Sequence, residues 1–227
     1  MKLKVSTSKD AISEASGGSY IAKSGVYDAT IKFASLDVSK NGAESINFNL
    51  DYKGNEQTIY GPYITDKEGN TLDIGAKLIN KLAVIIGMEE GDSYEIEEET
   101  HAVGKDKKPQ EFSVITNFTD QPIKIHLQEE YSISKGGAND GQIRKAMVIK
   151  NFFRADGASA EEIVNGTETG KRLETTLEKY ASNVTYRDEL TPEMVEEWKK
   201  ARASDSKPAA TPAPKASAAK KAGSVFK

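Results

Sequence analysis

Apolar and polar residues alternate along several segments between residues 25 and 151. Residues 46–52 place Ile, Phe, Leu and Tyr at every second position, and residues 30–33 follow the same rule. A period of two is typical of β-strands with one buried face. Further strands are expected at 57–63, 93–97, 111–117, 123–134 and 143–150. Pro62 limits the strand expected at 57–63 to an edge or an end of the sheet.

A helical period interrupts the strands at residues 75–87. Apolar residues recur there at the spacing of one helix face, and Gly87 stands where a C-terminal cap belongs. Beyond residue 155 the helical period returns. A capping box at Ser159–Glu162 and an N-cap followed by proline at Thr191-Pro192 predict two helix starts.

The order of these segments predicts a mainly β (α+β) fold, a barrel of five to seven strands with one inserted helix, followed by C-terminal helices and a tail. Four parts are expected along the chain. They are a flexible N-terminal arm (1–22), a β domain (23–155), a helical appendage (156–203) and a disordered tail rich in Ala, Pro and Lys (204–227).

Charge separates the tail from the rest of the chain. Residues 204–227 contain five lysines and one acid, Asp205, whereas residues 1–203 contain 26 basic and 34 acidic residues, a net charge of −8. A composition like that of the tail buries too little apolar surface to fold alone. A cationic arm on an acidic body suggests a protein that holds or recruits a partner. The acidic body argues against non-specific duplex binding over the whole surface.

The chain contains no cysteine, which excludes a disulfide framework, a thiolate metal site and a cysteine nucleophile. The first twenty residues lack the apolar core of a secretory signal, and no segment approaches the roughly 18 apolar residues of a membrane span. We therefore expect a cytoplasmic protein without membrane contact.

Catalytic signatures are weak. The segment 166–172 resembles a phosphate loop. However, three residues separate its glycines where the phosphate-loop motif has four, and Arg172 stands where the motif has the Ser or Thr that binds Mg²⁺. We therefore expect a polar turn before a helix. His101 and His126 have no partner at ligand spacing. The acidic runs 89–90 and 97–99 point in several directions and favour a solvated face. We predict no catalytic residue, no metal and no cofactor.

Aromatic and basic residues of the β region favour single-strand binding, which needs rings for base stacking and cations for phosphates. Tyr60 and Tyr63 flank a Gly-Pro pair, where an exposed ring is hard to explain by packing. Phe152 and Phe153 are adjacent, and their side chains cannot both point inward along an extended strand. The predicted contacts are Tyr27, Tyr52, Tyr60, Tyr63, Lys105, Lys107, Lys108, Arg144, Lys145, Lys150, Phe152, Phe153 and Arg154. The alternative for the lysine loop is a solvated turn.

Residues 25–32, then 46–50, then Tyr60-Gly61-Pro62-Tyr63-Ile64-Thr65 ahead of the expected helix, resemble the single-stranded DNA-binding proteins encoded by tailed bacteriophages. The resemblance covers about residues 20–155 and rests on the order and texture of segments. It implies an OB-fold that coats single-stranded DNA during replication and recombination in an infected host cell. It also implies a disordered tail that contacts replication proteins, and some proteins of this class activate transcription.

The tail departs from that family, whose tails are acidic and end in an aromatic residue, whereas this tail is basic and ends Val225-Phe226-Lys227. Two roles are compatible with its charge. It adds affinity for DNA, or it presents a basic and aromatic end to an acidic surface of a replication or transcription enzyme. The residues concerned are Lys220, Lys221, Phe226 and Lys227.

The leading interpretation is therefore a non-enzymatic single-stranded DNA-binding protein with a partner-recruiting tail. A viral structural or assembly protein with a self-associating β domain is the alternative. A metal-dependent nuclease is a third hypothesis, for which the sequence offers no convergent carboxylate set. The oligomeric state, the preference for DNA or RNA and the partner of the tail are left open.

Overall fold

The computed structural model describes residues 20–104, 106–136 and 139–205. The chain divides into two compact units after Glu189. Most of the predicted N-terminal arm lies outside the described residues, as does Lys105. The same holds for all of the predicted tail beyond Asp205, including Lys220, Lys221, Phe226 and Lys227.

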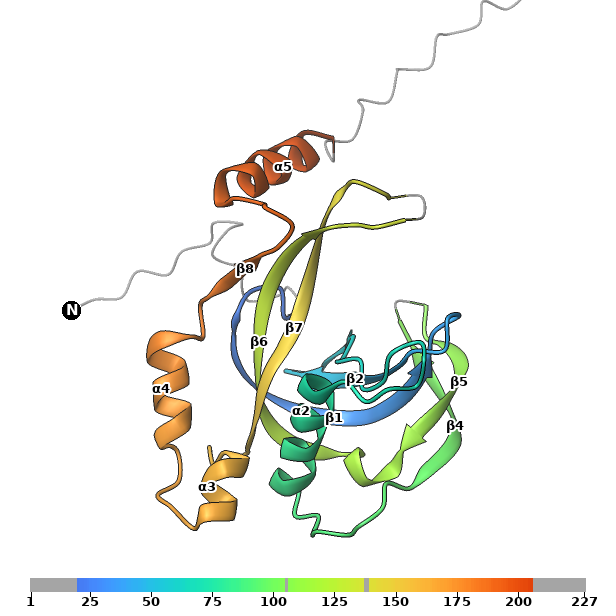
Figure 1. Cartoon of the computed structure of the whole chain (residues 1–227), viewed down its shortest axis with the longest axis vertical. Helices are drawn as coiled ribbons and strands as arrows, with labels where there is room; N and C mark the ends of the chain where they lie inside the picture. Colours follow the sequence, from blue (N-terminus) through green and yellow to red (C-terminus); the bar gives the residue numbers. More distant parts are fainter. Residues whose placement is uncertain (1–19, 105, 137–138, 206–227) are drawn as a thin grey trace, which may run out of the picture. The chain divides into compact units, whose positions relative to one another are not determined.

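The first unit contains eight strands and most of the helices (Figure 1). The strands are β1 (Gly25–Val38), β2 (Glu44–Tyr52), β3 (Asn55–Ile59), β4 (Ile96–Val103), β5 (Lys108–Ile115), β6 (Gln121–Ile133), β7 (Ile143–Arg154) and β8 (Val184–Tyr186). The helices are α2 (Asp73–Ile85), the 3-10 turn η1 (Thr116–Phe118), α3 (Ala160–Asn165) and α4 (Lys171–Lys179). The second unit contains α5 (Pro192–Asp205), whose first turn is capped by the Thr191 hydroxyl, which accepts from the Met194 amide.

Strand β1 is the centre of the sheet. One side pairs with β2, and the other side pairs with β6 along its first half and with β5 near its end, all antiparallel. The sheet continues from β2 to β3, from β5 to β4 and from β6 to β7, and β8 adds in parallel to β6. Within the described residues, β3, β4, β7 and β8 are edge strands, and β3 and β7 do not pair with each other.

The prediction of a mainly β fold with several helices is confirmed. The sheet is open, however, and a closed barrel is not confirmed, because β3 and β7 leave a gap where closure requires a ladder of hydrogen bonds. The described part of the chain forms eight strands, where five to seven were expected. The extra strand β8 has three residues, too few for its period to be detected in the sequence.

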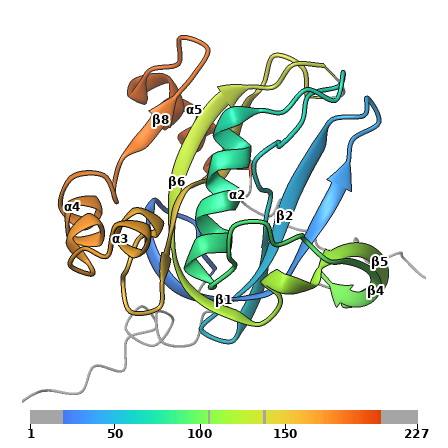
Figure 2. The same ribbon diagram turned by 60° about the horizontal axis from the view of Figure 1, so that its bottom comes forward.

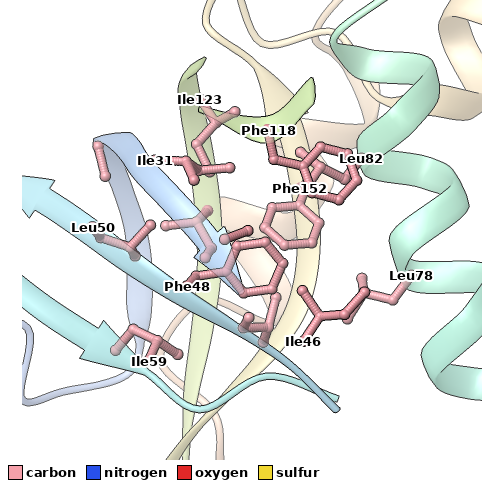
Figure 3. Close-up of a cluster of buried hydrophobic side chains, with 14 of the residues drawn as sticks. Ile31, Ile46, Phe48, Leu50, Ile59, Leu78, Leu82, Phe118, Ile123 and Phe152 are labelled. Carbon is pink, nitrogen blue, oxygen red and sulfur yellow. The ribbon is translucent and has the colours of Figure 1, made fainter. Parts of the chain in front are cut away.

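The main core lies between the sheet and α2 (Figure 3). Ile31, Phe48, Leu50, Leu82 and Phe152 are fully buried in it. Burying each such side chain contributes about 1.5–3 kcal/mol. Figure 2 shows α2 lying along the curved sheet with α3 beside it. The predicted apolar face of this helix is confirmed, because its residues at the expected spacing are the buried ones.

The turn from β2 to β3 contains Lys53 and Gly54, both with positive φ (53° and 79°). Tyr52 pairs directly with Asn55, so the connection is a two-residue hairpin turn. The tight hairpins that match strand twist require positive φ at both central positions, and Lys53 adopts it here.

The segment that resembles a phosphate loop surrounds a carboxylate of the protein itself. Glu162 accepts hydrogen bonds from the backbone amides of Ser159 (2.8 Å), Arg172 (2.7 Å) and Gly170 (3.4 Å). The Ser159 hydroxyl accepts from the Glu162 amide in return, which confirms the predicted capping box. Glu162 thus holds the amides at the start of α4 that a bound anion would otherwise use.

We predict that Glu162→Gln lowers the free energy of unfolding by about 2 kcal/mol at neutral pH, because hydrogen bonds to a buried charged group are strong. Glu161→Gln is the matched control. Its partly exposed ion pair with Lys81 is worth less than about 1 kcal/mol. Urea unfolding of both variants measures the difference, and equal losses would contradict the role of the buried carboxylate.

A low pH should remove the stabilisation of the fold by the Glu162 carboxylate. Burial alone would raise the pKa of Glu162, but the amides of Ser159 and Arg172 outweigh it and lower the pKa below its ordinary value of 4.5. A group with a lowered folded-state pKa stabilises the fold above its unfolded pKa, and that stabilisation disappears as the pH falls through the folded-state value. The stability difference between the wild type and Glu162→Gln should therefore shrink below about pH 4.5. A difference independent of pH would contradict it.

Candidate nucleic-acid interface

A groove of about 640 Å³ separates β3 from β7. One wall consists of residues 57–63, from the end of β3 and the segment that follows it, together with Ser45 and Asn47 of β2 and Asp37 of β1. The opposite wall consists of residues 144–149 of β7, with Glu130 of β6 beside them. The groove therefore occupies the gap that keeps the sheet open.

Residues 60–63 are fixed to β2 by their backbone. The Gly61 amide donates to Asn47 Oδ1 (3.2 Å), and the Pro62 carbonyl accepts from the Ile46 amide (3.2 Å). A Cβ added at Gly61 would lie only 1.6 Å from the Ile46 carbonyl oxygen. Glycine is thus required for this approach of two backbones.

Helix α2 contacts the same segment from another direction. Gly75, in the first turn of the helix, is buried, and a Cβ added there would lie 1.9 Å from the carbonyl oxygen of Tyr63. The segment 60–63 is therefore positioned by a glycine of its own against β2 and by a glycine of α2. The backbone is held, while the side chains of Tyr60 and Tyr63 are exposed.

Tyr60 and Tyr63 are the aromatic side chains of this wall. Their exposed fractions are 77% and 54%, although their backbones are held on both sides. Exposed rings on a fixed backbone lose little conformational entropy when a flat ligand stacks on them. They provide two such rings at the rim of one groove.

Arg144 supplies the cation on the opposite wall. Its Nε donates to the Ser132 hydroxyl (2.9 Å), and it forms no ion pair within the described residues. Lys145 also lines the groove, but it is paired with Glu129 (2.9 Å). Glu130 is paired with Arg187 (2.7 Å). Arg144 is thus the basic residue of this groove that remains available to an anion.

Four of the predicted nucleic-acid contacts are brought together here: Tyr60, Tyr63, Arg144 and Lys145. Tyr27 and Tyr52 lie elsewhere and pack edge to face on each other at 5.3 Å, both half-buried. The Tyr27 hydroxyl donates to the Lys23 carbonyl (2.7 Å). Partial burial and the nearby Tyr52 and Glu129 raise its pKa. This pair stabilises the sheet and does not line the groove.

The remaining predicted cations lie outside the groove. Lys107 pairs with Glu56, Lys108 approaches Asp106 at 3.9 Å, and Arg154 holds Asp156 through two nitrogens. Lys150 is exposed at the bulge opposite the His126/Leu127 register shift. The β4–β5 turn that carries Lys107 and Lys108 is therefore paired with acids, in agreement with a solvated turn.

Phe152 and Phe153 require a correction. They point to opposite faces of β7 as expected, but both are fully buried, so the inference that one ring must reach the surface is wrong. Phe152 packs on Phe48 in the main core. Phe153 is on the other face of β7. The strand β8 lies beside β6, where the Thr185 hydroxyl donates to Gln128 Oε1 (Figure 1). Neither ring is accessible to a base.

Two residues that position the site, Gly75 and Asn47, were not predicted from the sequence. In the sequence, Gly75 is an ordinary residue near the start of the expected helix, and Asn47 is one of the polar positions of an alternating strand. Their roles arise from contacts with residues 61 and 63, which are distant in the chain. A glycine in the first turn of a predicted helix, where it costs stability, was the available hint.

Within residues 20–104, 106–136 and 139–205, neither histidine belongs to a group of three ligating side chains. His101 stacks on Phe33 at 4.0 Å and meets Glu99 (2.7 Å), whereas His126 is buried, which lowers its pKa. The described residues contain no group of three or more His, Cys, Asp or Glu able to hold a metal ion.

None of the helices described is long and apolar enough to cross a membrane. A scan against protein-family models and a search of curated proteins both found no match.

We predict that Gly75→Ala destabilises the fold by about 1–3 kcal/mol, because the new methyl group overlaps the Tyr63 carbonyl. In an unobstructed helix the same change stabilises by about 0.5–1 kcal/mol, so the sign of the effect is diagnostic. Thermal unfolding measures it. An unchanged or higher stability would show that the segment 60–63 is not held by α2.

Proposed function

We propose that this chain is a non-enzymatic single-strand nucleic-acid-binding protein, with single-stranded DNA as its ligand. The strand lies in the groove between β3 and β7. Bases stack on Tyr60 and Tyr63, and Arg144 contacts a backbone phosphate. Base stacking contributes about 1–3 kcal/mol for each base.

One observation carries the proposal: two exposed tyrosine rings on a fixed backbone line the same groove as an arginine that has no acidic partner among the described residues. Stacking surfaces next to a cation are the two elements that sequence-independent strand binding needs. The acidic body of the chain is compatible with this, because a single strand in one groove avoids most of the surface.

The order of strands and helices supports the interpretation of the sheet as OB-like. Strands β1, β2 and β3 are followed by a helix and then by the β6–β7 pair, with the β4–β5 hairpin inserted between them. OB-folds are partly open five-stranded barrels that bind oligonucleotides over the face of their second and third strands. We propose that this sheet is an open variant of that barrel, and its groove borders β2 and β3.

The same proposal extends to a biological setting. The protein would coat single-stranded DNA during replication and recombination in a phage-infected host cell. The basic segment 204–227 would recruit replication or transcription proteins. Both statements rest on the resemblance of the sequence and on the charge of that segment.

Fluorescence anisotropy with an oligo(dT) strand of about thirty nucleotides, long enough for more than one OB-sized site, tests the proposal. We expect binding at low salt that weakens as salt rises, with little dependence on base sequence. Parallel titrations with an RNA strand and a duplex establish the preference. The absence of binding to both single strands at low salt would refute the proposed function.

Replacing Tyr60 or Tyr63 by alanine should weaken strand binding by about 1–3 kcal/mol each, because each change removes one stacking surface. Tyr60→Phe and Tyr63→Phe should retain the affinity, since stacking does not need the hydroxyl. Tyr180→Ala is the matched control, because this tyrosine is half exposed and lies outside the groove. Equal losses in all three alanine variants would contradict the assignment.

Arg144→Gln should lower the affinity and reduce the slope of log K against log salt by about 0.7, the value for one phosphate contact with a single strand. Arg154→Gln is the matched control, since its guanidinium already holds Asp156. It should leave the slope unchanged. A slope change in the control but not in Arg144→Gln would place the phosphate track elsewhere.

A self-associating assembly protein remains the second candidate, because one feature favours it. The outer edges of β3 and β7 pair with no strand in the described part of the chain, and such edges can pair with a second copy. Sedimentation velocity without nucleic acid distinguishes the two functions. Self-association combined with no affinity for single strands would select assembly.

A further inference from the structure

A second groove lies on the helical side of the first unit, between α2, α3 and the segment 87–94 that leads toward β4. It has a volume of about 620 Å³. Its apolar lining consists of Ala83, Val84, Met88, Tyr94, Ile163 and Val164. Figure 2 shows α2 and α3 side by side at this place.

The exposure of Val164 is unusual for an apolar side chain on a helix. It is 71% exposed, although α3 contacts α2 and buries other residues of the same turn. A second shallow hollow, lined by Val84 and Val164 from its other side, continues the surface, and Lys77 and Lys81 border it, with Lys81 paired to Glu161. The apolar area is thus continuous across both helices and is open to solvent.

Acidic side chains form one rim of this groove. Glu89, Glu90 and Asp92 lie on the segment after α2, and none of them forms an ion pair within the described residues. Asp92 accepts from the Glu89 amide (2.8 Å), which fixes the loop and keeps the carboxylates together. An apolar floor with an acidic rim matches a ligand that is both basic and apolar.

The chain itself contains a segment of that chemistry. Residues 220–227 read Lys-Lys-Ala-Gly-Ser-Val-Phe-Lys, with three cations and the apolar pair Val225-Phe226. Residues 206–219 separate this segment from α5 and can span at most roughly 50 Å when fully extended. Such a length is sufficient to reach a neighbouring molecule.

We propose that residues 220–227 of a second copy dock in this groove. Phe226 enters the apolar lining near Met88 and Val164, and Lys220 and Lys221 meet the acidic rim. The interaction links copies head to tail, because groove and segment are different surfaces. It does not depend on nucleic-acid binding, since it lies on elements other than those that carry Tyr60 and Arg144.

Photo-crosslinking tests this proposal with the full chain. Phe226 is replaced by benzoylphenylalanine, and equal amounts of this protein and a ¹⁵N-labelled wild-type copy are irradiated at low salt. We expect hybrid-mass crosslinks between position 226 and the groove, at residues 83–88 or 163–164. Crosslinks within one copy only, crosslinks at residues 60–63, or no crosslink would overturn the proposal.

Two double variants separate a specific contact from general charge attraction. Glu89→Gln with Glu90→Gln should lose most of the crosslink, because the rim charge is removed at exposed positions. Glu97→Gln with Glu111→Gln removes the same charge from the exposed β4–β5 hairpin and should leave the yield unchanged. Equal losses in both pairs would overturn the assignment. Anisotropy of the same proteins on oligo(dT) reports separately on the proposed strand binding.

Discussion

The pairing of β1 with three partners on two sides determines the shape of the sheet. Its one side belongs to β2, and its other side is divided between β6 and β5. A strand that pairs with two different neighbours along one side must bend between them. The pairing of β1 with β6 ends at Ile31 and its pairing with β5 involves Ser35 and Leu36, and the register shift between Ile31 and Phe33 lies between these two regions. The β2–β3 and β6–β7 pairs then lie on different sides of β1. Their outer strands leave the groove between them.

The proposed binding surface follows from this opening together with two glycines. Gly61 allows the segment after β3 to approach β2, and Gly75 allows α2 to approach the same segment. The core under α2, centred on Phe48, Leu82 and Phe152, stabilises all three elements. Tyr60 and Tyr63 are therefore exposed for a structural reason, because the backbone that carries them is fixed and the core is already filled by other rings.

Local patterns predicted the elements well and their long-range contacts poorly. The strict alternation of residues 46–52, the helical face of α2 and the capping box at Ser159 all depend on neighbours within a few residues, and they are confirmed. Tyr60 and Tyr63 were identified because a Gly-Pro pair breaks the strand between them. Phe153 was misassigned because its complete burial depends on tertiary packing, which the alternation within β7 does not predict. Likewise, the composition of the chain does not predict the ion pairs of Lys107 and Arg154.

The central claim is that a single strand contacts the rings beside the groove between β3 and β7. Ultraviolet crosslinking of the full chain to oligo(dT) carrying 5-iodouracil measures that contact directly, because this base reacts with the aromatic ring it stacks on. The account predicts crosslinks at Tyr60 and Tyr63. Crosslinks confined to other exposed tyrosines, such as Tyr20, Tyr94 or Tyr180, would contradict it.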